Sequence, residues 1–270
     1  MSDPLVVSIG WDVRGWRSKE QATAVLGIFP ETPKLRWLGI SPLFPFKPGT
    51  PLGFDSLVGP AVGEEGADLI RNCPVITIAI DAPLAFPADF IRLIEGEAIT
   101  QIPTKREIDN PLAYRACEHW VHDAHGKKPL SSSFDKLGNN ATLAMSICNS
   151  LREEGFSVVP QDGDLNRHTT IEVYPGITKV GPKKINRAIP PVDAHIPPNL
   201  EPGTDQYDAA ICAIMGAVYG GGGSVLSLPD LGMPLVEMNP TEGWIFSFPP
   251  DYLKQYLSEK LPGNTHAEIF

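Results

Sequence analysis

The chain of 270 residues is 42% hydrophobic and 20% charged, and these fractions are typical of an ordinary globular protein. A chain of this length buries most of its apolar surface without disulfides or a structural metal. Its formal net charge of −10 argues against the broadly basic surface of a nonspecific nucleic-acid binder. Contacts with phosphates must therefore be local, and the candidate groups are Lys105-Arg106, Lys127-Lys128, and Lys183-Lys184 with Arg187. The alternative is that these are scattered, solvated side chains.

The cysteines and the apolar segments indicate a reduced, cytoplasmic protein. The four cysteines are widely spaced and include no CxxC pair, which favours free thiols in a cytosolic protein. The first residues lack the basic region of a signal peptide. The longest apolar stretch, from Pro74 to Pro87, is interrupted by Asp81 and is too short to span a bilayer. We therefore expect no membrane association.

Three short strands are predicted near the N-terminus. The apolar, β-branched run from Leu5 to Ile9 predicts a buried strand that ends at Gly10-Trp11-Asp12. Residues 22–29 and 34–40 predict the second and third strands, and their spacing favours an antiparallel meander. A loop rich in proline and glycine follows at residues 41–53.

The middle of the chain predicts helices around one central strand. Residues 54–72 have patchy helical periodicity. Residues 75–80 are apolar on both faces, which predicts a central strand that stops at Asp81-Ala82-Pro83. Residues 111–125 and 139–154 predict two more helices.

The last third of the chain predicts one strand, a loop-rich region and one helix. Residues 169–174 predict the strand, and 179–202 hold six prolines without clean periodicity. Thr204 is the expected N-cap of a helix over 204–219, and 243–246 predict a last short strand or an aromatic plug. This order predicts a mixed α/β sheet flanked by helices in a single domain, 1–270, with a helical insertion near 100–160.

Acidic residues accompany the predicted strands and the late helix. Asp12 and Asp81 end their strands, and functional groups in open α/β sheets gather beyond the carboxyl ends of strands. Glu172 lies within its strand. Asp205 and Asp208 are three residues apart and share one face of a helix. The alternative for each acid is that it caps a turn or a helix.

Clustered carboxylates need either a proton or a cation. Two of them about 4 Å apart repel by roughly 4 kcal/mol at an effective dielectric near 20. Oxygen ligands without cysteine or histidine favour Mg²⁺ or Mn²⁺. Two such ions about 3.5–4 Å apart activate water and stabilise the leaving oxygen of a phosphodiester, which is the chemistry of a nuclease.

Five short motifs follow one another along nearly the whole chain. They are Gly10-x-Asp12 with Gly15 and Trp16, Ile80-Asp81-x-Pro83, Glu172-x-x-Pro175, Asp205-x-x-Asp208-Ala209-Ala210, and Glu242-Gly243-Trp244-Ile245. This ordered set resembles the DUF429 family, predicted nucleases of the ribonuclease-H-like superfamily.

The resemblance implies both a fold and a site. The implied fold is a five-stranded mixed sheet, with three antiparallel strands and then parallel crossovers, that carries Asp12 on the first strand and Asp81 on the fourth. Metal-binding aspartates are implied on a late helix. Asp12, Asp81 and Asp208 would hold Mg²⁺ or Mn²⁺, and Glu172 and Asp205 would be additional ligands or orient the water.

Other signals bear on the substrate. Arg115 is a candidate phosphate contact, together with Lys183, Lys184 and Arg187. The histidines His119 and His122 are three residues apart and form no HExxH motif, which favours a solvated helix face. The glycine run 220–223 follows a helix, whereas phosphate-cradling loops precede one.

The leading hypothesis is a metal-dependent nuclease that hydrolyses DNA or RNA with two metal ions. One alternative is a noncatalytic binding module, which the net charge of −10 favours. The other is a nucleotide phosphotransferase of the actin/Hsp70-like group, which would need duplicated halves that this chain does not show.

Overall fold

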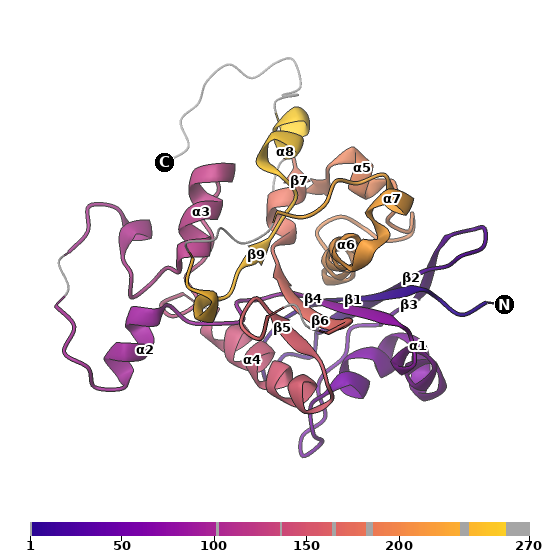
Figure 1. The fold of residues 1–270 in the computed structure, drawn as a ribbon, viewed down its shortest axis with the longest axis horizontal. Coiled ribbons are helices and arrows are strands. Elements are labelled where there is room, and N and C mark those ends of the chain that lie inside the picture. Colours follow the sequence, from indigo (N-terminus) through magenta and orange to yellow (C-terminus); the bar gives the residue numbers. More distant parts are fainter. Residues whose placement is uncertain are drawn as a thin grey trace.

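Figure 1 shows the protein as a computed structural model, which describes residues 2–100, 103–135, 137–163, 166–181, 186–232 and 238–257. The predicted phosphate contacts Lys183 and Lys184 lie outside these ranges.

A mixed sheet of seven strands forms the centre of the molecule, and its main path runs in the order β3-β2-β1-β4-β6-β5. The strands are β1 (Val6–Asp12), β2 (Ala22–Ile28), β3 (Leu35–Ile40), β4 (Val75–Asp81), β5 (Ser157–Val159), β6 (His168–Val173) and β9 (Ile245–Phe246). The pairs β1–β2 and β2–β3 are antiparallel, and all other pairs are parallel. The mixed sheet is confirmed, and the expected number of five strands is wrong because β5 and β9 both add to the far edge of β6.

Helices cover both faces of the sheet, which gives three layers (Figure 1). The helices are α1 (Phe54–Arg71), α2 (Ala88–Ile94), α3 (Ala116–His125), α4 (Gly138–Glu153), α5 (Pro190–Asp193), α6 (Asp205–Ala217), α7 (Gly223–Leu226) and α8 (Pro250–Leu257). Shorter elements are η1 (Glu107–Asp109), η2 (Pro175–Thr178), η4 (Val218–Gly222), η5 (Pro240–Glu242) and the hairpin of β7 (Lys179–Val180) and β8 (Arg187–Ala188). One core lies between the sheet and α1 with α4, and the other lies between the sheet and α6.

Residues of β1 alternate between these two cores. Val7, Ile9 and Trp11 pack toward α1 and α4, so Gly10 and Asp12 face the side of α6. Every residue of β1 and β2 is buried, as expected of strands that are covered on both faces.

Small residues let α6 lie directly on β1. A side chain at Gly10 would overlap the backbone of Ala209 and Ala213, and a side chain at Gly216 would overlap the hydroxyl of Ser8. Thr204 caps the helix, because its hydroxyl accepts a hydrogen bond from the amide of Tyr207, as the sequence predicts. The close packing of α6 on β1 brings the first turn of the helix near the carboxyl end of the strand.

The segment from Asp205 to Leu226 is long and apolar enough to cross a bilayer, and it is the one candidate span in the described residues. Buried packing explains this composition, because 72% of its most apolar window is enclosed by the rest of the protein.

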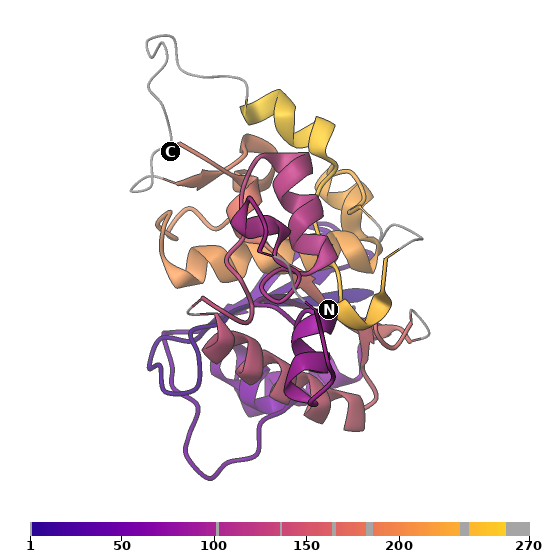
Figure 2. The ribbon, with the colours of Figure 1, turned by 90° about the vertical axis from the view of Figure 1, so that its left-hand side faces the viewer.

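Helices α2 and α3 stand beyond one end of the sheet, and Figure 2 looks onto them from that end. The helix predicted over residues 111–125 begins only at Ala116, because residues 111–115 form turns and an extended N-cap at Arg115. Helix α4 lies in the predicted insertion, yet its Leu143, Ile147 and Leu151 belong to the core beneath the sheet.

Candidate functional site

The carboxyl ends of β1 and β4 place two aspartates side by side. Asp12 and Asp81 are the last residues of their strands, and they are paired in the parallel register. Paired residues on adjacent strands lie about 5 Å apart and point to the same face of the sheet. Both therefore point to the side on which α6 lies.

The first turn of α6 adds two more acids. Asp208 is close enough to raise the pKa of both Asp12 and Asp81, and Asp205 raises the pKa of Asp12. Asp12, Asp81, Asp205 and Asp208, four of the five acids that the sequence predicts to converge, thus lie close enough for their charges to interact.

Two basic side chains partly neutralise the cluster. The guanidinium of Arg14 pairs with Asp205, and its Nε lies 3.5 Å from Oδ2 of Asp12. The ammonium of Lys179, on β7, pairs with Oδ1 of Asp208. The sequence analysis missed both. Arg14 stands only two residues after Asp12, which was an available signal, whereas Lys179 lies in a loop-rich segment without a motif.

Burial and mutual repulsion make these acids hard to ionise. Burial raises the pKa of Asp12 well above its ordinary value, and the charge of Asp81 adds to the effect. The pKa of Asp81 rises to about 7, first through burial and then through Asp208, although Lys179 opposes the shift. Burial also raises the pKa of Asp208. The site therefore favours a bound proton or a further cation.

Some carboxylate oxygens in the site lack a donor. Oδ2 of Asp12 is buried and accepts no hydrogen bond. Within the described ranges, Asp81 makes neither a hydrogen bond nor an ion pair. A buried polar atom without a partner is costly, so Oδ2 of Asp12 points to a ligand, and the half-buried carboxylate of Asp81 beside it has room to share that ligand.

These side chains open into a cavity of about 240 Å³. Its acidic lining consists of Asp12, Asp81, Glu118, Glu172 and Asp208. The apolar part of its wall includes Leu130, Leu137 and Ile245. A space of this size accommodates a metal ion with its waters and a small phosphate ester.

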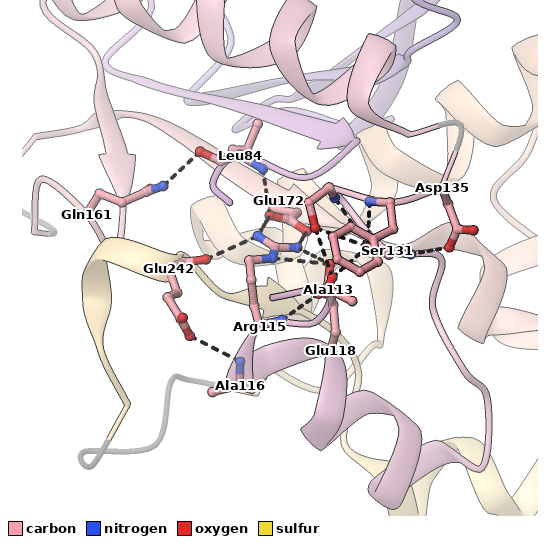
Figure 3. A network of polar contacts seen from close by, with 12 residues as sticks. Leu84, Ala113, Arg115, Ala116, Glu118, Ser131, Asp135, Gln161, Glu172 and Glu242 are labelled. Atoms are coloured by element: carbon pink, nitrogen blue, oxygen red, sulfur yellow. Dashed lines mark hydrogen bonds and ion pairs between the residues drawn. The ribbon is translucent and has the colours of Figure 1, made fainter. Parts of the chain in front are cut away.

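Glu172 reaches this cavity but is held by a buried arginine (Figure 3). Arg115 is 1% exposed, and its guanidinium donates to Oε1 of Glu172 at 2.6 Å and to Oε2 at 2.8 Å. The amide of Leu84 donates to the same Oε2 at 2.9 Å. Glu172 is therefore fixed by charge and by hydrogen bonds, and its role as a metal ligand or water-orienting group stays a prediction.

Arg115 joins several distant segments. It also donates to Glu118 at 2.9 Å and to the carbonyl of Glu242 at 3.1 Å. The carboxylate of Glu242 accepts from the amides of Ala88 and Ala116. These bonds connect α2, α3, β6 and η5 at the edge of the cavity, and Figure 3 shows the contacts of Arg115 with Glu172 and Glu242 and that of Glu242 with Ala116. The guanidinium is saturated by protein groups, which does not favour its predicted contact with a substrate phosphate.

The remaining predicted phosphate contact, Arg187, lies on β8 and is exposed. Its guanidinium lies 3.4 Å from Asp193 and not in the cavity. A lysine that the sequence analysis named only as part of a basic pair lies closer: Lys127 is near enough to feel the charges of Asp208 and Asp81. Its ammonium donates to the carbonyl of Gly176.

The cluster can be tested for its fit to a metal ion. Across the described part of the chain, no three side chains of His, Cys, Asp or Glu are gathered so that they could hold one ion. A Mg²⁺ ion, however, keeps several waters and is usually bound by one or two carboxylates together with substrate phosphates. Asp12 and Asp81 supply such a pair of hard oxygen ligands.

The four cysteines, Cys73, Cys117, Cys148 and Cys212, are free and buried, as predicted. Comparison of the chain with protein-family models, with curated proteins and with solved structures finds no match.

Proposed function

We propose that this protein is a hydrolase that cleaves phosphodiester bonds of nucleic acid with the help of Mg²⁺ or Mn²⁺. The observation that carries the proposal is the pair of Asp12 and Asp81 at adjacent strand ends, with carboxylate oxygens that lack donors at the base of a cavity. Hard oxygen ligands without sulfur or nitrogen are those preferred by these ions.

The chain's own residues have distinct roles in this proposal. Asp12 and Asp81 hold the cation, and Asp208 with Asp205 supplies further negative charge at the first turn of α6. A divalent ion bound there lowers the pKa of bound water and polarises a phosphoryl oxygen. Glu172 lies at the cavity wall, where its position is fixed by Arg115.

The arrangement of the acids supports a ribonuclease-H-like fold. Asp12 ends the first strand, Asp81 ends the fourth, and both lie in a mixed sheet that begins with three antiparallel strands. Asp205 and Asp208 open a late helix. This is the order that the resemblance to the DUF429 family implies, and we propose that the chain has that fold and the associated chemistry.

The test is cleavage of short DNA, RNA and a small chromogenic phosphodiester in the presence of Mn²⁺, Mg²⁺ or a chelator. We expect cleavage that requires the ion and is lost in Asp12→Asn and Asp81→Asn. Asp68→Asn is the matched control, because Asp68 is exposed on α1, away from the cavity. Cleavage by Asp81→Asn at the rate of the parent protein would refute the proposal.

A second candidate function is a noncatalytic binding module. It is favoured by the ion pairs of Arg14 with Asp205 and of Lys179 with Asp208, which neutralise part of the acidic cluster without a metal. The two candidates differ in a calorimetric titration with Mn²⁺, because a module of this kind has no need to bind the ion.

A further inference from the structure

The acidic site carries less uncompensated charge than its carboxylates suggest. Its four acids are Asp12, Asp81, Asp205 and Asp208, and its two paired cations are Arg14 and Lys179. With all six groups ionised, a net charge of −2 remains, which one divalent cation would balance.

Lys179 occupies the helix side of the cluster. Its side chain is 8% exposed, its ammonium contacts Asp208, and its charge acts on Asp81. A lysine is rarely buried to this extent unless it is paired with an opposite charge, so the ion pair with Asp208 is an integral part of the site. Asp208 is therefore engaged by a cation that belongs to the protein.

The strand side of the cluster differs in this respect. Asp81 has no hydrogen bond or ion pair in the part of the chain that the structure describes. Among the described residues, the one cation paired with Oδ2 of Asp12 is Arg14, whose Nε lies at a distance of 3.5 Å. The buried Oδ2 of Asp12 and the half-buried carboxylate of Asp81 face the cavity from adjacent strands, and they are the groups left for an external cation.

We infer that the site binds one divalent ion, held by Asp12 and Asp81, and that the ammonium of Lys179 takes the place of a second ion beside Asp208. The inference rests on the proposed cation site and narrows it, since the sequence alone favours two ions. Lys179 is then a resident positive charge on the α6 side of the cavity, while the external ion binds on the strand side.

The second basic residue nearby does not change this assignment. Burial lowers the pKa of Lys127, and the nearby charge of Lys179 lowers it further. Its ammonium donates to the carbonyl of Gly176, and not to a carboxylate. Although the charge of Asp81 acts on Lys127, the described contacts of Lys127 include no ion pair with Asp12 or Asp81, so their oxygens stay open to the ion.

The experiment is a titration of the metal-free protein with Mn²⁺, followed by calorimetry and by electron paramagnetic resonance. We expect one equivalent of Mn²⁺ and the six-line spectrum of an isolated ion. Two equivalents with a spin-coupled spectrum would overturn the inference. Asp81→Asn should weaken binding by more than about 10-fold, since even groups that only orient a ligand contribute 10- to 100-fold.

A lysine variant tests the role of the resident charge. Lys179→Met leaves Asp208 without its cation, and we expect a second equivalent of Mn²⁺ to bind. Lys179→Arg keeps the charge and should still bind one equivalent, which also guards against a variant that fails to fold. Lys128→Met is the matched control, because Lys128 pairs with Glu107 outside the cavity. If folded Lys179→Met binds one equivalent of Mn²⁺ with the affinity of the parent protein, the ammonium of Lys179 does not replace a second metal ion.

The result separates this inference from the proposed function. A protein that binds one Mn²⁺ and gains a second in Lys179→Met, yet cleaves no phosphodiester, upholds the inference and refutes the nuclease. A protein that cleaves the phosphodiester and binds two Mn²⁺ ions upholds the nuclease and refutes the inference. No binding of Mn²⁺ by the parent protein overturns both.

Discussion

Asp81 lies at the carboxyl end of β4 with Asp12 beside it, and Lys179 and Arg14 are the cations that lower its pKa. Burial raises that pKa more than any charged neighbour does, so the shift would persist in part if a single neighbour were removed. The free-energy cost of ionising Asp81 in a buried position falls on the folded state alone, because the unfolded chain exposes the carboxyl group to water. Under the proposed function, Asp81 is therefore a residue at which ion binding and stability oppose each other.

We predict that metal-free protein loses stability as the pH rises toward 7. The pKa of Asp81 is about 7 in the folded protein against an ordinary value of 3.8, so the folded state binds more protons than the unfolded state between these pH values. The free energy of unfolding therefore falls as pH increases through this window. Asp81→Asn should flatten the decline and raise the unfolding temperature at pH 8, by roughly 2–4 °C for each kcal/mol of cost removed.

The measurement is thermal unfolding at pH 5 and pH 8 in the presence of a chelator. Asp68→Asn should follow the parent protein at both values. An Asp81→Asn protein with the same pH dependence as the parent would show that this carboxyl does not titrate in the window.

Arg115 is a buried arginine whose ion pairs with Glu118 and Glu172 stabilise the fold. We predict that Arg115→Met lowers the free energy of unfolding by about 3–5 kcal/mol, because Glu118 and Glu172 remain buried without their partner. Arg92→Met, which removes an exposed arginine paired with Asp89 and Glu97, should change it little. Chemical denaturation compares the two, and equal losses would mean that the buried network is not the source of stability.

At the scale of elements, the contact between α6 and β1 positions the site. Gly10 lies against the backbone of the helix, and no other residue type fits there without a shift. We predict that Gly10→Ala costs about 1–3 kcal/mol by overpacking. It should also weaken Mn²⁺ binding, because α6 carries Asp205 and Asp208 toward the strand ends.

The control for this prediction is Gly59→Ala. Gly59 lies in α1, and a methyl group there meets nothing within 4 Å. Gly59→Ala should change stability by no more than about 1 kcal/mol, because the better helix propensity of alanine is opposed by Pro60, which disfavours a side chain on the helical residue before it. If Gly10→Ala is as benign as Gly59→Ala, the close packing of α6 on β1 does not position the site.

Elements with a strong local pattern could be predicted from the sequence. The apolar run before Asp81 predicted a central strand, and β4 indeed lies between β1 and β6. Thr204 predicted the start of α6. Strand β5 was missed because its three residues make no pattern by themselves and are defined by pairing with β6. Helix α2 was missed because it buries none of its residues and so lacks an amphipathic stripe.

The candidate site was predictable in its acids but not in its cations. Asp12 and Asp81 could be placed together because parallel strands end at the same edge of a sheet. The pairing of Arg115 with Glu172 joins residues 57 positions apart, and nothing local in either segment indicates it. Lys179 meets Asp208 only through the packing of the β7–β8 hairpin against α6.

At the scale of the whole molecule, the net charge of −10 opposes the approach of a long polyanion. We predict that kcat/KM for an oligonucleotide of about 20 nucleotides changes by less than about 10-fold between 50 and 200 mM salt, because basic side chains of the protein neutralise few of its phosphates. A binder with 6–10 phosphate contacts loses about 10³–10⁵ in affinity over this range.

The comparison uses the same oligonucleotide and a small phosphodiester across a salt series. The small substrate, which makes no extended contacts, is the control. A steep fall for the oligonucleotide alone would reveal a basic surface that the described residues do not show.

The docking of α6 onto β1 also has a consequence for synthesis of the chain. Asp12 and Asp81 leave the ribosome more than a hundred residues before Asp208, and until then the face of the sheet that α6 covers has no partner. Contacts between segments so far apart form late, because closing long loops costs entropy before it is rewarded. The nascent protein thus carries Asp12 and Asp81 without the helix that brings Asp205 and Asp208 beside them, so the acidic cluster is completed only after α6 has been made.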